Sequence, residues 1–332
     1  MSRSLIIMPD DSAQPVLAAI DGSKTSICIK MFAFTHPPLL SAVLDAHRRG
    51  VHVRVMLNPH RRSGESDNQE ARTALSEAGV EVRDSNPAFE ITHEKSMVVD
   101  GEHAFVESLN WTTEGVTETR DYAVVTPHSR EITEMIDCFE ADWNKQDFHP
   151  GHRSHLIWCP RHGRARIAEF IDTAKETLFV QNERYQDPFI IERLVRAARR
   201  GVKVHVMARA PHTLKESKLV EGVSGLRILD DVGIHVRTLK HLKLHAKMIL
   251  ADEEQAVIGS INLSPGSFDY RRELAIQVDD PHMVKRLRKT AHHDWDSSHK
   301  LDLSDDGLFD DLKDKYSDVV DRLGLHVDDD ER

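Results

Sequence analysis

The chain has 332 residues, of which 39% are hydrophobic and 30% charged, a composition typical of a folded protein with one large or two ordinary domains. No apolar run approaches the roughly 18 residues of a membrane helix, and the N-terminal apolar stretch is too short for a signal peptide, so we expect a soluble, cytoplasmic protein. Residues 301–332 hold twelve acidic and four basic residues and so carry −8 of the net charge of −11; the nearly neutral remainder argues against a nucleic-acid binder with a broad basic surface.

Predicted strands and helices alternate along the first half of the chain. Over residues 39–56, apolar residues at helical spacing, an Arg-Arg-Gly stop and alternating valines predict a helix followed by a strand. The order strand, helix, strand, helix, strand, hairpin, strand, helix rests on residues 25–34, 39–56, 77–83, 93–110, 120–125 and a closing helix with Asp142 and Trp143. Such alternation indicates a sheet covered by helices.

The second half repeats this pattern. The matching segments are residues 177–185, 190–207, 231–237, 245–262, 272–278 and a closing helix with Asp294 and Trp295. We therefore predict an α/β protein of two domains related by a pseudo-two-fold axis, each a mixed β-sheet flanked by helices. The predicted domains are residues 1–150 and 151–300, and an acidic tail at 301–332 is partly helical, from Leu308 to Leu323, or disordered.

Two groups of residues that often bind metals or form disulfides are given plainer interpretations. Three histidines lie in the junction loop at residues 148–155, which we read as a solvated linker rather than a metal site. They are His149, His152 and His155. The three cysteines lack the spacing of a disulfide framework, so buried reduced thiols are predicted. They are Cys28, Cys138 and Cys159.

The most specific feature is a pattern that occurs at residues 93–110 and again at 245–262. Each copy has a histidine, a lysine two residues later, an aspartate five residues after that, and a closing Ser-x-Asn. The pairs, each 152 residues apart, are His93/His245, Lys95/Lys247, Asp100/Asp252, Ser108/Ser260 and Asn110/Asn262. The surrounding residues alternate as in a strand, so the histidine and lysine of each copy are predicted to share a face. A two-fold arrangement would bring both copies around one substrate.

Two histidines, two lysines and two asparagines suit chemistry on a phosphodiester. The lysines neutralise the non-bridging oxygens and the amides donate hydrogen bonds to them, so no metal or other cofactor is required. One imidazole can attack phosphorus while the other protonates the leaving oxygen. The matched carboxylates Asp121 and Glu273 are candidates to orient the imidazoles. Asp100 and Asp252 fall at strand ends and are interpreted as turn-forming residues.

The doubled H-x-K-x4-D-x6-G-S-x-N pattern resembles the phospholipase D superfamily, especially bacterial cardiolipin synthases and related phospholipase D-like proteins, over about residues 15–300. The second copy matches throughout and includes Gly259. The resemblance implies a metal-independent phosphatidyltransferase or phosphodiesterase that works through a covalent phosphohistidine, with Ser108 and Ser260 in supporting roles. It also implies that His93 is the nucleophile and His245 the general acid, an order that the residues themselves do not establish.

The first copy departs from the family pattern at Glu107, where glycine is usual. Glu107 either reshapes an edge of the pocket and selects a polar head group, or points away from the site on ordinary β backbone. We favour the second interpretation.

Three functions are compatible with these residues. We favour a phospholipid enzyme that contacts the inner face of the membrane peripherally through loops 36–40 and 264–272, with Phe268 and Tyr270 as candidate contacts. Phe268 fits a core position equally well. A nuclease using the basic segments 60–66 and 161–166 is disfavoured by the neutral body, and a non-catalytic phospholipid-binding protein by the intact second motif. The acidic tail could also cover the cationic cleft, in which case deleting residues 301–332 would raise activity at low salt.

Overall fold

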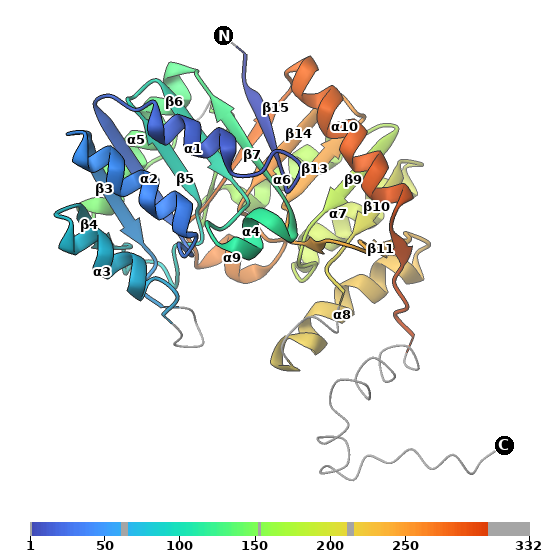
Figure 1. Cartoon of the computed structure of the whole chain (residues 1–332). Helices are drawn as coiled ribbons and strands as arrows, with labels where there is room; N and C mark the ends of the chain where they lie inside the picture. Colours follow the sequence, from blue (N-terminus) through green and yellow to red (C-terminus); the bar gives the residue numbers. More distant parts are fainter. Residues whose placement is uncertain (1, 61–65, 152–153, 211–215, 305–332) are drawn as a thin grey trace.

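The structure, a computed structural model, describes residues 2–60, 66–151, 154–210 and 216–304 (Figure 1). The first half consists of β1 (Ser4–Met8), α1 (Gln14–Asp21), β2 (Ser26–Met31), α2 (Pro37–Arg48), β3 (His52–Leu57), α3 (Gln69–Glu77), β4 (Glu81–Asp84), β5 (Ser96–Val99), β6 (His103–Glu107), α4 (Thr113–Thr117), β7 (Thr119–Thr126) and α5 (Ser129–Trp143).

The second half has the same succession of main elements. It consists of β8 (Leu156–Cys159), α6 (Gly163–Thr173), β9 (Thr177–Gln181), α7 (Pro188–Arg199), β10 (Lys203–Met207), α8 (Glu216–Asp231), β11 (Val236–Thr238), β12 (Lys243–Leu244), β13 (Met248–Ala251), β14 (Gln255–Gly259), α9 (Pro265–Asp269), β15 (Glu273–Val278), α10 (Pro281–Asp296) and β16 (His299–Lys300).

Each half is built on one mixed sheet. The strand orders are β1-β7-β6-β5-β2-β3-β4 and β16-β11-β10-β9-β13-β14-β15-β8. Strands β2, β3 and β4 are parallel because helices connect them, whereas the tight turn between β5 and β6 makes that pair antiparallel. The central strand β2 is covered on both faces, which explains its run of apolar residues from Ile27 to Ile29.

Apolar side chains form one core on the outer side of each sheet and a shared core between the halves. In the first half, Val16 and Ile20 of α1 and Leu39 and Val43 of α2 pack against the sheet. The shared core joins side chains of β7, β15, α5 and α10, so burial of each large aliphatic side chain, worth about 1.5–3 kcal/mol, holds the two halves together.

The predicted α/β class with two similar mixed sheets is confirmed. The sequence analysis missed the first strand and first helix of each half, namely β1, α1, β8 and α6. The two strands are short and lie near the N-terminus and the junction loop. No extended periodic pattern in the sequence marks either of them. The one-turn helices α4 and α9 were also missed, since five residues carry no helical period.

The remaining expectations concern cysteines, loop histidines and the tail. All three cysteines are buried and free, as predicted. His149 contacts Arg161, and His155 contacts Glu131. His152 and the predicted tail helix lie outside the described residues. Among the helices that are described, none is both long and apolar enough to cross a membrane.

Candidate active site

The two histidine segments cross between the halves. Strand β12, just before His245, pairs in parallel with β7 of the first half. The backbone N–H of His245 donates to the carbonyl of Arg120 at 3.3 Å, and that of His93 donates to the carbonyl of Arg272 at 2.9 Å. Each histidine is therefore held by the backbone of the opposite half.

The prediction that each histidine and lysine sit within a strand was wrong. Strands β5 and β13 begin one residue after the lysines, at Ser96 and Met248, because the preceding segment binds the opposite half instead of its own sheet. The two side chains nevertheless stay together. The Nζ atom of Lys95 donates to the carbonyl of His93 at 2.5 Å, and Lys247 donates in the same way to His245.

Each imidazole is oriented by a carboxylate from the other half. The Nδ1 atom of His93 lies 2.9 Å from Oε2 of Glu273, and Nδ1 of His245 lies 3.0 Å from Oδ2 of Asp121. Since an ionised carboxylate only accepts, Nδ1 carries the proton and Nε2 is left for chemistry. The carboxylates predicted from the repeat are thus brought to the histidines, but across the interface between halves.

Hydroxyl groups hold these carboxylates in place. Ser108 donates to Oδ1 of Asp121 at 2.6 Å, and Thr119 donates to Oδ2 at 2.7 Å. Ser267 donates to Oε1 of Glu273 at 2.7 Å, while Ser260 donates to the carbonyl of Leu274. Thr119 and Ser267 were not predicted, because neither belongs to a repeated pair and a lone hydroxyl residue carries no sequence signal.

Burial and charge make the two pairs unlike. Burial, followed by the positive charges of Lys95 and Lys247, lowers the pKa of His93 well below its usual value. Burial also raises the pKa of its partner Glu273. Burial acts against ionisation of Asp121 as well, but the charge and hydrogen bond of His245 outweigh it and lower the pKa of Asp121. Burial therefore disfavours the charged forms of the His93–Glu273 pair, whereas Asp121 of the second pair keeps its negative charge.

The lysines and asparagines complete a cationic, hydrogen-bonding surface. Burial lowers the pKa of Lys95 to about 7 and also lowers that of Lys247. After burial, the charge of Glu273 acts to raise the pKa of Lys95 and the charge of Lys247 acts to lower it. The side chains of Asn110 and Asn262 make no hydrogen bond with any described residue, and their Oδ1 atoms are buried. The amide NH₂ groups of the two asparagines, rather than these oxygens, can donate to an anion.

Two buried ion pairs join the halves next to the carboxylates that orient the histidines. Arg272, next to Glu273, binds Asp142 of α5 at 2.9 Å, and Arg120, next to Asp121, binds Asp294 of α10 at 2.9 Å. The repeated Asp-Trp motif of the closing helices thus supplies the aspartates of these pairs. Each arginine fixes the start of the strand that carries a histidine-orienting carboxylate.

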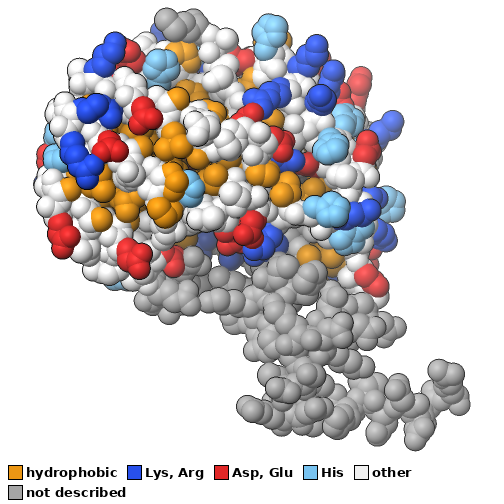
Figure 2. Space-filling view, in the orientation of Figure 1, with side chains coloured by type: hydrophobic (Ala, Val, Ile, Leu, Met, Phe, Trp, Pro, Cys, Tyr) orange, Lys and Arg blue, Asp and Glu red, His pale blue; other side chains and the backbone are white. Residues whose placement is uncertain are grey.

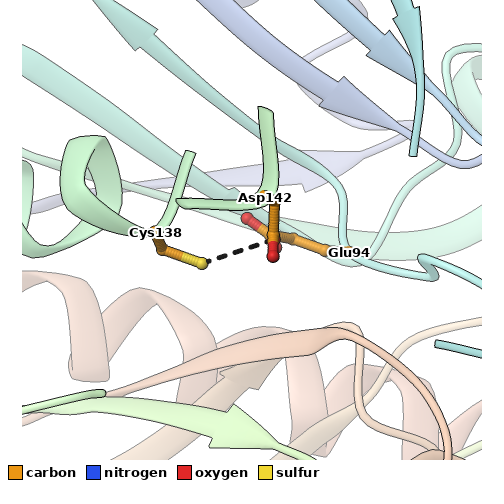
Figure 3. A group of neighbouring side chains, drawn as sticks. All are labelled: Glu94, Cys138 and Asp142. Atoms are coloured by element: carbon orange, nitrogen blue, oxygen red, sulfur yellow. Dashed lines mark hydrogen bonds between the residues drawn. The ribbon is translucent and has the colours of Figure 1, made fainter. Parts of the chain in front are cut away.

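A buried cluster that includes Asp142 of the first ion pair has the residue types of a metal site. Glu94, Cys138 and Asp142 lie close together, from the histidine segment and α5 (Figure 3). However, the Nζ atom of Lys30 lies 2.7 Å from Asp142 and 3.1 Å from Glu94. Because the Lys30 ammonium group and the Arg272 guanidinium group balance the two carboxylates, the cluster is a buried ion network in which side chains supply the cations.

Removing the shared carboxylate of the Asp142 ion pairs should strongly destabilise the protein. We expect Asp142→Asn to lower the free energy of unfolding by about 3–5 kcal/mol, because Lys30 and Arg272 would stay buried without their main partner. Urea denaturation measures this loss. Asp45→Asn, which breaks an exposed pair with Arg48, is the matched control and should cost less than about 1 kcal/mol. A loss for Asp142→Asn no larger than for this control would contradict the assignment.

The motif aspartates anchor the hairpin turns. Oδ1 of Asp100 accepts from the backbone N–H groups of Thr25 and Ser26 at 2.7 and 2.9 Å, and Oδ1 of Asp252 accepts in the same way from Glu176 and Thr177, where β9 begins. Both have positive φ, at 54° and 51°, which a turn requires. Neither aspartate contacts the histidines, so their contribution to the site is the placement of the hairpin.

Glu107 and Gly259 occupy equivalent strand positions with different surroundings. A Cβ atom on Gly259 would lie 2.2 Å from the carbonyl oxygen of Leu274, so β14 requires glycine there. In β6 there is room for a side chain, and Glu107 accepts a hydrogen bond from the indole of Trp111 at 2.8 Å. Its carboxyl group is fully buried against Trp111, which favours the interpretation that Glu107 packs inside the first half over a role at the edge of the pocket.

The buried carboxyl of Glu107 predicts a pH-dependent stability. Burial raises its pKa to about 8, against 4.5 for the free group. The stability it contributes is complete below pH 4.5 and is lost as pH rises toward 8, because the unfolded chain ionises first. Glu107→Gln should therefore raise the free energy of unfolding, relative to wild type, by on the order of a few kcal/mol at pH 8. At pH 4.5 the gain should be near zero; a gain independent of pH in thermal denaturation would refute this account.

Two further residues line the site at matching positions after β2 and β9, and the repeat gave no signal for them because they differ. The ring of Phe32 lies edge-on to His93, with centroids 4.9 Å apart, and 5.0 Å from Nζ of Lys95. Glu183 has Oε2 at 3.8 Å from Nε2 of His245 and 3.5 Å from Nζ of Lys247. One histidine is thus faced by a ring and the other by a carboxylate.

The candidate membrane and nucleic-acid contacts are only partly retained. Phe268 is buried in the second core, so of its two interpretations the core position is correct and the membrane contact is not, whereas Tyr270 is 62% exposed. Residues 61–65 of the first basic segment lie outside the described residues. In the second, Arg164 is bound by Asp187 and Asp269, which leaves it less free for phosphate.

Comparisons with known proteins agree with this architecture. A family model described as "Cardiolipin synthase, PLD-like domain" matches residues 16–143 and 167–295. The polyphosphate kinase of Vibrio parahaemolyticus is 26% identical over 287 residues, which span 81% of this chain but only 40% of that protein. Cardiolipin synthase B of Escherichia coli K12 is 26% identical over 297 residues, covering 75% of this chain and 68% of the relative.

A solved structure shows the same fold over nearly the whole chain. Phosphatidylserine synthase of Haemophilus influenzae Rd KW20 superimposes with a TM-score of 0.77 at 10% identity, covering 97% of this chain and 93% of that one. At this identity the likeness concerns the fold alone. Together with the family model, it accounts for two similar sheets in one chain.

Proposed function

The chain belongs to the cardiolipin synthase, phospholipase D-like domain family, and we propose that it is a phosphodiesterase or phosphatidyltransferase that acts on phospholipids through a covalent phosphohistidine. The observation that carries this proposal is the pair of histidines, each oriented by a carboxylate of the other half, with two lysines beside them. This arrangement provides a nucleophile, an acid and charge neutralisation without a metal.

Electrostatics support His93 as the nucleophile and His245 as the acid. A neutral imidazole is needed for attack, and burial lowers the pKa of His93, which Phe32 also covers. His245 instead faces two carboxylates: its Nδ1 lies 3.0 Å from Asp121 and its Nε2 lies 3.8 Å from Glu183.

The reaction then takes place in two steps. Nε2 of His93 bonds to phosphorus as the bond to the leaving oxygen breaks, and His245 gives its proton to that oxygen. In the second step His245 takes a proton from water or an alcohol, whose oxygen bonds to phosphorus as the bond to His93 breaks. Lys95 and Lys247 stabilise the charge on the non-bridging oxygens in both steps.

Exposed apolar groups support a phospholipid as the substrate. Figure 2 shows hydrophobic side chains over the middle and left of one face, where α1 and α2 lie, with charged side chains around them. Leu17, Leu40 and Leu44 are partly exposed there. Elsewhere Phe189 at the start of α7 is 42% exposed. Such surfaces suit peripheral contact with a bilayer.

A side-by-side product assay tests this function. The full chain is incubated with vesicles of phosphatidylglycerol, vesicles of other phospholipids, and single-stranded DNA, each with and without EDTA. We expect head-group release from phospholipid, with phosphatidic acid or cardiolipin as the lipid product, at the same rate with EDTA. Cleavage of DNA alone would favour the nuclease alternative, binding without turnover the non-catalytic one, and loss with EDTA followed by rescue with metal would overturn the mechanism.

A further inference from the structure

Each half of the chain forms one wall of the site: Phe32 lies in the wall from the first half and Glu183 in the wall from the second. The two walls differ in chemistry at this one matched position. Phe32 and Glu183 correspond because the residues that follow them bind alike: Thr35 and His36 donate to the carbonyl of Trp111, and the matched pair in the second half donates to that of Leu263. The first wall is aromatic at this point and the second carries a carboxylate. This difference makes the two histidines chemically distinct toward small hydroxyl compounds.

Glu183 lies within ion-pair distance of three cations but accepts no hydrogen bond from a described residue. Its side chain is 11% exposed, with Oε2 3.5 Å from Lys247 and Oε1 3.8 Å from Arg184 and 3.9 Å from Arg209. Burial acts against ionisation, but these cations and His245 lower the pKa of Glu183 well below its usual value. Within the described part of the chain, no hydrogen bond to its carboxylate is formed. An ionised carboxylate in this state can accept a donor from a bound molecule.

Its position relative to His245 identifies which molecule that is. Oε2 lies 3.8 Å from Nε2 of His245, the atom that takes the acceptor's proton in the second step. Building on the proposed phosphatidyl transfer, we propose that Glu183 binds a second hydroxyl group of a polyol acceptor and so selects the alcohol that His245 deprotonates. Hydroxyls on adjacent carbons reach both atoms at once: one gives its proton to Nε2 and bonds to phosphorus, and the other donates to the carboxylate.

Charge balance favours a hydroxyl over an ammonium group at this place. Lys247, Arg184 and Arg209 already surround the carboxylate, so a further full cation would meet repulsion. A neutral hydroxyl gains a charge-assisted hydrogen bond without that cost. On the other wall, Phe32 offers no acceptor and covers His93 and Lys95, which keeps alcohol and water from approaching on that side.

Competition between two three-carbon alcohols tests this role. Vesicles of phosphatidylglycerol are incubated with equal concentrations of deuterated glycerol and 1-propanol, and mass spectrometry measures labelled phosphatidylglycerol, phosphatidylpropanol and phosphatidic acid. We expect the wild type to prefer glycerol by about tenfold or more, because a site built for a hydroxyl discriminates against an analogue that lacks it. Glu183→Ala should lose most of this preference, which is read from the ratio of labelled phosphatidylglycerol to phosphatidylpropanol and so does not depend on the total turnover.

Two further variants make the test decisive. Glu183→Gln keeps the shape and should show an intermediate preference, which guards against misfolding of the alanine variant; Glu192→Gln on the exposed side of α7 is the matched control and should behave as wild type. An unchanged glycerol preference in Glu183→Ala, no transfer to glycerol by wild type, or loss of all turnover in Glu183→Gln would each overturn the assignment. Absence of any phosphatidylglycerol turnover by the wild type would instead overturn the proposed function on which it rests.

Discussion

His93→Ala and His245→Ala should each lower kcat/KM for phospholipid cleavage by at least about 10³-fold, because one variant lacks the nucleophile and the other the acid and base. Their intermediates should differ. His93→Ala should form no phosphoenzyme, whereas His245→Ala should form it slowly with a substrate that has a good leaving group, since such a leaving group needs no proton. Trapping with a lipid labelled at phosphorus, followed by acid-lability of the bound label, measures this difference.

A surface pair of the same residue types provides the control. His52 contacts Glu81 on the exposed edge of the first sheet, and His52→Ala should leave kcat/KM unchanged. Circular dichroism and thermal denaturation should show folded protein for all three variants. Retention of turnover in either site variant would rule out a shared site, and a phosphoenzyme in His93→Ala would reverse the two roles.

Glu273→Gln and Asp121→Asn should lower kcat/KM by about 10²–10⁴-fold, although each residue lies in the opposite half from the histidine it affects. An amide of the same shape can donate its NH₂ group to Nδ1 and so place the proton of the neutral imidazole on Nε2. This removes the Nε2 lone pair that His93 needs for attack and that His245 needs to accept a proton. The effect should fall on kcat more than on substrate binding, since neither carboxylate is predicted to contact the phosphate.

The crossed arrangement gives this prediction a specific readout. Glu273→Gln acts on His93 and should slow phosphoenzyme formation, whereas Asp121→Asn acts on His245 and should slow its breakdown as well. Rapid-quench measurement of the labelled enzyme separates the two steps. Glu81→Gln on the surface is the matched control. If both variants turned over as wild type, the carboxylates would have no part in orienting the imidazoles.

The repeat in the sequence was sufficient to predict that the histidines and the downstream carboxylates lie together. It did not predict which carboxylate pairs with which histidine. Two copies of one motif identified His93, His245 and the downstream carboxylates, because duplication makes unrelated coincidence improbable. The pairing of His93 with Glu273 across the halves could not be read from the chain, since a pattern of matched positions fits pairing within a half equally well. That choice depends on how strands β7 and β12 meet in space.

Residues that break the symmetry were missed for a related reason. Thr119, Ser267, Phe32 and Glu183 have no equivalent of the same type in the other half, so a search for repeated residues excludes them. Glu107 was noticed because it departs from the family pattern, yet its burial against Trp111 depends on the space left by β7. Packing of this kind is not encoded in local sequence.

The differing walls of the site have a consequence for how such a protein can evolve. In a homodimer of single-motif chains, one gene encodes both walls, so every substitution appears twice. A duplicated and fused gene encodes each wall separately, and one copy can acquire Phe32 while the other acquires Glu183. Each half supplies the carboxylate that orients the histidine of the other half, and this limits the freedom to diverge. Recombination that replaces one half preserves the site only if the new half still carries that carboxylate.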